Sequence, residues 1–417
     1  MRTQNAHEIR PLEFIVLVAC IMLLTAVAID IMLPAFDELR DYFGLGQEST
    51  ATAQIVTFFF LGQIGQIIFG PLSDRYGRLL ILRVGFALYI GGCIAAALSP
   101  SLGLMLAARF VVGLGAAALS VSAVTSVRDR FAGDKMARTM SLILTIFLGV
   151  PIVAPLIGAA ILSVSSWQVV FLTPAVIAVA VFIWSFRLNE SLPPERRLKL
   201  DVTTLIRSAR QVGGNRDFVR YTAITTILFS VFSSYISSSE RMISEIYGRP
   251  DLFAWIFSGV GITMAIFTFL NAQLVGRFGA RRTIRSLLTI YFILACVLFG
   301  LTLAFQGTPN IFIFFAIVAL LQGINVAAEP NSSALALESL GSTAGMAAAI
   351  YGTSFFVIGS TVGSFIDRLL VDSVTPLATG YLIVGLITVV LAYTGRTRAA
   401  VDAPANPIST NVADERA

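Results

Sequence analysis

Twelve long apolar segments make up most of the chain, and they constrain its fold more than any other feature. An α-helix needs about 20 consecutive apolar residues to cross a lipid bilayer, and each segment is close to that length. The sequence therefore predicts an all-α, polytopic membrane protein with 12 transmembrane helices. The predicted spans are 14–36, 51–72, 80–99, 102–126, 137–163, 168–187, 218–239, 252–274, 284–305, 309–329, 345–366 and 376–394.

Composition supports a lipid environment, because only 13% of the residues are charged and 56% are hydrophobic. A soluble domain carries about 25% charged residues. Cys20, Cys93 and Cys296 lie inside apolar segments and are interpreted as small buried hydrophobic residues. His7 lies in the polar N-terminal segment without a histidine or cysteine beside it. We therefore expect no metal site, no cofactor and no enzymatic activity.

A basic, glycine-bearing turn occurs twice in the chain, which indicates an internal duplication. Residues 70–78 read Gly-Pro-Leu-Ser-Asp-Arg-Tyr-Gly-Arg, and residues 274–279 repeat part of this at a spacing of 202 residues. The copies are unequal, because Gly276 stands where the first copy has Asp74. The predicted organisation is an N-terminal six-helix lobe at 1–187, a cytoplasmic linker at 188–217, a C-terminal six-helix lobe at 218–396, and a disordered cytoplasmic tail at 397–417.

The distribution of Lys and Arg predicts the orientation in the membrane. With the N-terminus inside, 24 of the 29 basic residues fall on the cytoplasmic side and four fall outside. This asymmetry follows the positive-inside rule, so both termini are expected in the cytoplasm. The net charge of +5 is then a consequence of topology, and nucleic-acid binding is not expected.

Two opposite charges are predicted inside the membrane, where a charged side chain is costly and needs a reason. Asp30 ends the apolar part of the first span, and Arg109 lies about seven residues into the fourth. At a rise of 1.5 Å per residue, both lie roughly 10 Å below the outer face, which suggests proximity. One interpretation is a site that couples protons or substrate. The alternative is a structural ion pair that fixes helix packing.

The fifth span contains Pro151, Pro155 and Gly158 among small residues. Prolines in a helix free backbone carbonyl groups, and small residues allow close helix packing. This pattern predicts a helix that bends as a lobe rearranges. A kink without a functional role is the alternative.

The second half carries polar residues within its predicted spans. Tyr235 lies among serines, and Asn325 and Asn331 lie at the end of the tenth span. We interpret these residues as candidates for the wall of a pocket. The pair Glu240-Arg241 is a further candidate, with a position at the outer water boundary as the alternative. Glu329 is expected near the inner boundary, solvated or gating rather than buried.

Together, these segments resemble the major facilitator superfamily, and specifically its drug:proton antiporters of the Bcr/CflA type. The resemblance covers about residues 10–395. It rests on the loop at 66–78, Asp30 with Leu33-Pro34-Ala35, Arg109-x-x-x-Gly113-x-Gly115, Ala154-Pro155-x-x-Gly158, Ser234-Tyr235-Ile236-Ser237 with Tyr247-Gly248, and Pro330-Asn331 with 334–337. Ala154 and Ala159 replace glycines that are usual in the fifth-helix motif, so a less pliable helix is expected.

This resemblance implies proton-coupled export of lipophilic or amphipathic small molecules, such as drugs, by alternating access of two lobes. Its implied partners are the small-molecule substrate, protons and the lipid bilayer of a bacterial inner membrane, with the protein as a monomer. Asp30 and Arg109 are the implied proton-coupling and substrate residues. The alternative is a carrier of the same fold for a specific metabolite, such as an amino acid, nucleoside or sugar derivative.

The resemblance also implies a cytoplasmic latch in the loop after the second span. Its residues are Gly70, Asp74, Arg75, Gly77, Arg78 and, at the end of the fourth span, Arg128. In this interpretation Asp74 pairs with Arg128 or Arg130 and holds the inner side closed.

Overall fold

The computed structural model describes residues 10–394 except 47–48, 132, 198–201 and 341–342. Its described residues form helices and connecting turns, without a β-strand. The predicted tail at 397–417 lies outside the described residues. The helices of the first half are α1 Pro11–Asp30, α2 Phe36–Tyr42, α3 Gln54–Gly62, α4 Gly65–Tyr76, α5 Arg78–Ala97, α6 Leu102–Arg130, α7 Gly133–Leu148, α8 Val150–Leu162 and α9 Trp167–Ser185.

The second half is helical in the same way. Its helices are α11 Arg216–Arg241, α12 Phe253–Phe278, α13 Ala280–Ala304, α14 Ile311–Leu337, α15 Ala344–Thr353, α16 Gly359–Leu369 and α17 Thr375–Tyr393, with α10 Val202–Gly213 before them. Short 3-10 turns occupy Leu33–Ala35, Ala51–Ala53, Pro194–Arg196 and Pro250–Leu252, and π-turns occupy Met242–Ile246 and Ser354–Ile358.

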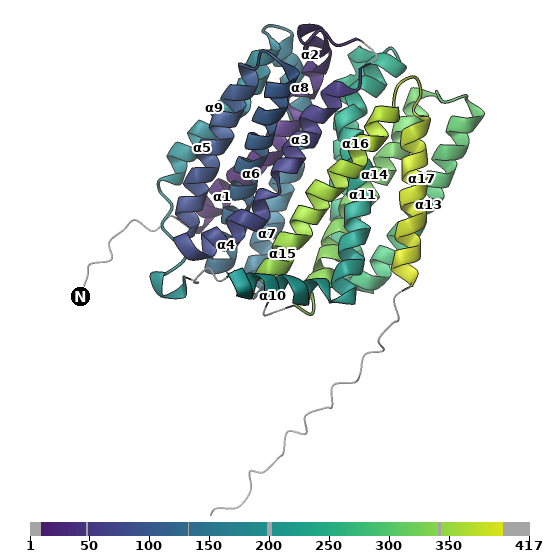
Figure 1. The fold of residues 1–417 in the computed structure, drawn as a ribbon. Helices are drawn as coiled ribbons and strands as arrows, with labels where there is room; N and C mark the ends of the chain where they lie inside the picture. Colours follow the sequence, from purple (N-terminus) through teal and green to yellow (C-terminus); the bar gives the residue numbers. More distant parts are fainter. Residues whose placement is uncertain (1–9, 47–48, 132, 198–201, 341–342, 395–417) are drawn as a thin grey trace, which may run out of the picture.

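The long helices lie side by side in two groups (Figure 1). Helices α1–α9 pack mainly against one another, and we call them the first half; α11–α17 form the second half. Helix α2 lies at one end of the molecule, and α10 lies across the opposite end. We refer to these as the α2 end and the α10 end.

Several membrane-length segments are interrupted. The first span breaks after Asp30, with Pro34 in the following turn, and the fifth breaks at Gly149, two residues before Pro151. Proline cannot donate the backbone hydrogen bond that a continuous helix requires, which explains breaks at these places. The fifth span is therefore interrupted, which both interpretations of its prolines predict; bending during a rearrangement stays a prediction.

Helix α11 is the exception among the predicted spans. Eleven helical segments of the described chain are long and apolar enough to cross a membrane, and α11 is not one of them. Its 26 residues nevertheless match the predicted span 218–239, and most of them are buried. Because α11 packs against α14, α16 and α17, its serines and threonines face other helices instead of lipid.

The repeated turn is also confirmed. Gly77 and Gly279 have φ values of +103° and +76°, and each directly precedes the next helix. This backbone conformation favours glycine. The surroundings differ, because a Cβ on Gly77 would lie 2.5 Å from the Glu190 carboxylate, whereas one on Gly279 would meet nothing within 4 Å.

Candidate functional site

Asp30 is a buried carboxylate at the boundary between the two halves. It is the last residue of α1 and is 3% exposed. Among the described residues it has no recorded hydrogen bond or ion pair. Tyr235 of α11 is close enough for its hydroxyl to interact electrostatically with Asp30, and that fully buried hydroxyl has no hydrogen-bond partner in the described structure. An unpaired acid of the first half and an unsatisfied hydroxyl of the second half are thus within electrostatic range of each other.

Arg109 does not pair with Asp30, so the interpretation as a structural ion pair is wrong for the described structure. Its Nη2 donates to the carbonyl oxygen of Ala28 at 2.8 Å, and its Nε donates to that of Ile55 at 3.4 Å. Its guanidinium carbon lies 5.0 Å from the centre of the Phe59 ring. Arg109 thus reaches α1 two residues before Asp30, but it braces α1 against α3 through backbone carbonyl groups.

Helix α8, which carries Pro151, Pro155 and Gly158, contacts both halves. On one side Gly158 lies directly against the carbonyl group of Ile31, where any Cβ would collide. On the other side Ser258 of α12 donates to the carbonyl oxygen of Ile152 at 2.7 Å. The broken fifth span therefore links the interruption after Asp30 to the second half.

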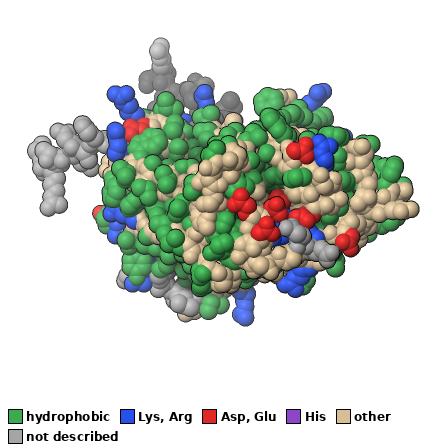
Figure 2. All heavy atoms as spheres, turned by 90° about the horizontal axis from the view of Figure 1, so that it is seen from above, with side chains coloured by type: hydrophobic (Ala, Val, Ile, Leu, Met, Phe, Trp, Pro, Cys, Tyr) green, Lys and Arg blue, Asp and Glu red, His purple; other side chains and the backbone are tan. Residues whose placement is uncertain are grey.

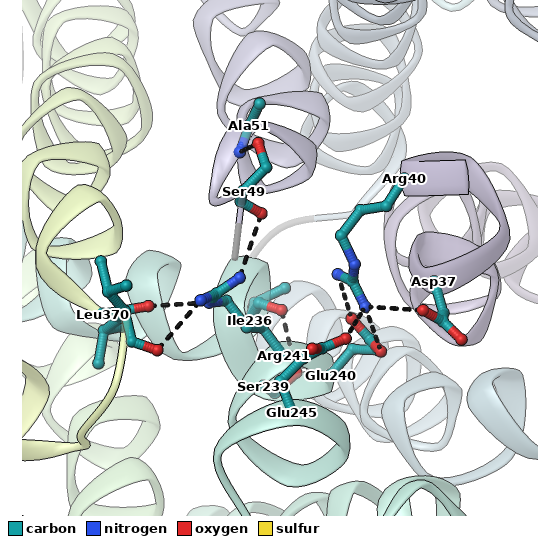
Figure 3. Close-up of polar contacts among 11 residues, drawn as sticks. Asp37, Arg40, Ser49, Ala51, Ile236, Ser239, Glu240, Arg241, Glu245 and Leu370 are labelled. Carbon is teal, nitrogen blue, oxygen red and sulfur yellow. Dashed lines mark hydrogen bonds and ion pairs between the residues drawn. The ribbon is translucent and has the colours of Figure 1, made fainter. Parts of the chain in front are cut away.

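A buried ion cluster joins the halves at the α2 end (Figure 3). Arg40 is fully buried, and its Nη1 lies 3.0 Å from Oε2 of Glu240, which is 3% exposed. Its Nη2 lies 2.8 Å from Oε1 of Glu245 and 3.3 Å from Oδ1 of Asp37. Figure 2 views this end and shows acidic side chains gathered near the middle of the face. We call Asp37, Arg40, Glu240 and Glu245 the ion cluster.

A second arginine connects the halves beside the ion cluster. Arg241 donates to the carbonyl oxygen of Ser49 in the first half at 3.3 Å. It also donates to the carbonyl oxygens of Leu370 at 2.8 Å and Val371 at 3.0 Å, just after α16 (Figure 3). The pair Glu240-Arg241 is therefore a contact between the halves, and both side chains are buried instead of solvated at the water boundary.

Aromatic rings add an apolar contact between the halves. The ring centre of Phe60 in α3 lies 5.0 Å from that of Phe229 in α11 and 5.7 Å from that of Phe356. Phe229 in turn lies 4.2 Å from Phe355. These rings and the ion cluster hold α3 and α2 against the second half.

A cavity of about 640 Å³ lies toward the α10 end. This size is in the usual range for small-molecule sites, which is about 300–1,000 Å³. Its walls come from α4, the start of α5, α6, α10 and α15, and thus from both halves and the segment between them. Four predicted latch residues are among its lining: Gly70, Asp74, Arg78 and Arg128.

Arg78 is the centre of the polar contacts on one wall of this cavity. Its Nη1 lies 2.6 Å from Oδ1 of Asp74, and its Nε lies 3.0 Å from Oδ2 of Asp129 in α6. The backbone nitrogen of Arg78 donates to Oε1 of Glu190 at 2.9 Å. The expected pairing of Asp74 with Arg128 or Arg130 is wrong in this structure, because Asp74 pairs with Arg78, four residues after it in the chain. Arg75 is exposed, and its guanidinium lies 5.1 Å from the centre of its neighbour's ring, that of Tyr76.

Asn325 and Asn331 connect helices inside the second half, and their predicted place in a pocket wall stays a prediction. Asn325 Nδ2 donates to the carbonyl oxygen of Leu228 at 2.8 Å, and Asn331 Nδ2 donates to Oδ1 of Asn271 at 2.8 Å. Buried amides are satisfied here by neighbouring helices. Glu329 is partly buried and accepts a hydrogen bond from the Tyr351 hydroxyl at 3.3 Å.

Sequence reasoning missed Arg40 and Asp367. Both are almost fully buried, at 0% and 3% exposure. Each lies near the end of a predicted span, where a charge is usually solvated. Only the neighbouring serines of α11, which lower the hydropathy of that helix, indicated a polar partner.

Comparison with known proteins places these features in a family context. A sequence profile of the Major Facilitator Superfamily matches residues 18–248 and 222–411. A bicyclomycin resistance protein homolog of Haemophilus influenzae is 28% identical over 368 residues, 87% of this chain and 91% of that protein. The multidrug resistance protein MdtL of Escherichia coli is 28% identical over 259 residues, 61% of this chain and 64% of that protein. These relatives confirm the resemblance drawn from the sequence motifs.

Solved structures confirm the fold class. A D-xylose-proton symporter superposes with a TM-score of 0.70 at 15% identity, covering 91% of this chain and 96% of that chain. The human organic anion transporter MFSD10 superposes with a TM-score of 0.63 at 15% identity, covering 92% of this chain and 100% of that chain.

Proposed function

The chain belongs to the Major Facilitator Superfamily, a family of transporters, and from this premise we propose that it exports lipophilic or amphipathic small molecules in exchange for protons. The relatives named for bicyclomycin and multidrug resistance support export of drug-like compounds. We place the protein in a bacterial inner membrane as a multi-pass monomer. The excess of Lys and Arg on the α10 side supports a cytoplasmic location for the α10 end and both termini.

We propose that residues 1–187 and 218–396 move as two lobes around a central path, joined by the linker at 188–217. The ion cluster and Arg241 close the α2 end, while the cavity of about 640 Å³ lies at the α10 end. This combination corresponds to a state whose path is closed to the outside. For the path to open at the α2 end, Arg40 and Arg241 must break their contacts with the opposite half.

The observation that carries the proposal is the position of Asp30. A buried carboxylate without a cation beside it is energetically costly in the membrane, so its presence indicates a function. Binding a proton removes its charge, and releasing the proton restores a charge that a cationic group or water must stabilise. Because α8 packs against Ile31, the residue after Asp30, and Tyr235 of the other half is within electrostatic range of Asp30, the charge of Asp30 can bias how the two halves meet. Arg109 holds the backbone of α1 in place for this exchange.

Transport into inverted membrane vesicles tests this function. Radiolabelled bicyclomycin is a suitable first probe, because a relative is named for resistance to it. We expect accumulation when the vesicle interior is acidified and collapse of that accumulation when a protonophore removes the gradient. Accumulation that is indifferent to the gradient would contradict proton coupling. If none of a panel of drugs is transported, the alternative function, a carrier for a specific metabolite, is favoured.

A further inference from the structure

Asp367 is a second buried carboxylate, and three serine hydroxyl groups of α11 surround it. It lies in the last turns of α16 and is 3% exposed. Its Oδ1 accepts hydrogen bonds from Ser234 at 2.6 Å and Ser238 at 2.9 Å, and its Oδ2 accepts one from Ser237 at 2.7 Å. Among the described residues it has no cationic partner, so these hydroxyl groups stabilise its charge. Hydrogen bonds to an ionised acceptor are stronger than neutral ones.

The two helices that meet at Asp367 are packed unusually closely. Gly363, one turn before Asp367, lies directly against the carbonyl group of Ser230, so a larger side chain would not fit there. Small residues on facing helices allow this approach in a membrane. Asp367 can therefore contact three hydroxyl groups on successive turns of α11, and a rotation of α11 would break several of these bonds together.

The same stretch of α11 carries the contacts between the halves. Glu240 lies two residues after Ser238 and binds Arg40, and Arg241 follows it. Arg241 also binds the carbonyl groups of Leu370 and Val371, three and four residues after Asp367. The outer turn of α11 is thus held to the end of α16 from both sides, by Asp367 and by Arg241.

We propose that Asp367 is a positioning residue for the outer gate: it fixes the rotation of α11 so that Glu240 meets Arg40 and Arg241 meets Ser49. The proposal rests on the alternating-access function proposed above. Asp367 acts through α11 and contacts neither Arg40 nor the path itself. When Asp367 is removed, the outer turn of α11 is free to rotate, and the closed state loses stability relative to the outward-open state.

A labelling experiment in intact cells tests this role. Cys20, Cys93 and Cys296 are replaced by alanine, and Ser239→Cys supplies a reporter that is 0% exposed when the gate is closed. A membrane-impermeant maleimide added outside then measures how often the gate opens. We expect Asp367→Ala to raise the labelling rate roughly tenfold, the scale expected for losing a charge-assisted hydrogen-bond set. Asp367→Asn keeps an acceptor and should give a smaller increase.

A double-mutant cycle separates gate positioning from general stabilisation of the fold. Because Asp367 acts partly through Glu240, the combined effect of Asp367→Ala and Glu240→Gln on labelling should be smaller than the product of the two single effects. Asp251→Asn is the matched control, because this exposed carboxylate pairs only with Arg249 beside it at 2.8 Å in the described structure and should leave labelling unchanged.

Unchanged labelling in Asp367→Ala would overturn the proposal, and so would additive effects in the double mutant. A variant that fails to reach the membrane is replaced by Asp367→Asn, whose labelling is read by the same two criteria. Labelling does not depend on proton coupling, so a failure of the transport experiment and a failure of this one are distinguishable.

Discussion

Arg40 and Glu240 form a buried ion pair across the two halves of the molecule, with 3.0 Å between Nη1 and Oε2 and 200 residues between them in the chain. Burying two charges removes their hydration, and their mutual attraction largely offsets this loss. Such a contact is specific in geometry without being strongly stabilising, because both charges regain water when the halves separate. It is therefore suited to a gate that must open in every transport cycle.

Glu240→Gln should shift the protein toward outward-open states, because Arg40 then loses its fully buried anionic partner and keeps only Glu245 and Asp37. We expect a change of roughly tenfold in the equilibrium, since removing one member of a buried charged pair has a large effect. Spin labels at Val164 and Trp255, which are 86% and 70% exposed in opposite halves, measure the separation of the halves. An unchanged distance distribution would show that the pair does not hold the gate.

Asp30→Asn should abolish substrate accumulation driven by a pH gradient. Substrate exchange across the membrane should persist when the pH is equal on both sides. The amide has a similar shape but cannot bind and release a proton, so the pH gradient can no longer drive transport through this residue. The measurement is transport in proteoliposomes over a series of pH gradients. Asp251→Asn, an exposed carboxylate at the α2 end, is the control and should behave like the wild type. Undiminished gradient dependence in Asp30→Asn would remove Asp30 from the coupling mechanism.

Arg109→Lys should impair both transport and stability, although the charge is retained. Arg109 holds the carbonyl groups of Ala28 and Ile55 with two separate nitrogens, and a lysine cannot reproduce this planar fork. We expect a loss of stability of about 1–3 kcal/mol from the unsatisfied carbonyl group, measured by thermal unfolding in detergent. A lysine variant with wild-type stability and transport would show that only the charge matters.

Arg78→Met should disturb the α10 end more than Asp74→Ala. Arg78 binds Asp74, Ser73 and Asp129 together, whereas Asp74 is 38% exposed and is bonded in the described structure through Arg78. Losing Arg78 leaves a pair of carboxylates without their shared cation beside the cavity. The accessibility of Met346→Cys, a lining residue of that cavity, reports the change in inverted vesicles. Equal effects of the two variants would contradict the central role of Arg78.

Gly158→Ala should destabilise the protein, because the added Cβ would collide with the carbonyl group of Ile31 next to Asp30. Overpacking of this kind costs about 1–3 kcal/mol. Gly259→Ala in α12 is a matched control, since a Cβ there meets nothing within 4 Å and alanine favours the helix. The unfolding temperature of Gly158→Ala should therefore fall, whereas that of Gly259→Ala should rise or stay unchanged. Equal stability would mean that α8 can shift away from α1 freely.

The sequence by itself determined the local features of this protein. Segment length and hydropathy specify membrane helices, and glycine at residues 77 and 279 specifies two related turns, because both properties depend on adjacent residues. Pro151 likewise predicted the interruption in the fifth span. Even α11, whose serines lower its hydropathy, corresponds to one of the twelve predicted spans, 218–239.

Tertiary structure alone decided which polar groups meet. Depth in the membrane placed Asp30 and Arg109 at similar heights, but depth does not specify the rotation of each helix, and Arg109 turned out to bind backbone carbonyl groups. The partners Arg40 with Glu240 and Asp367 with Ser234 lie 200 and 133 residues apart. Such pairs form only after packing fixes the rotation and register of whole helices, and that packing depends on side chains from many segments at once.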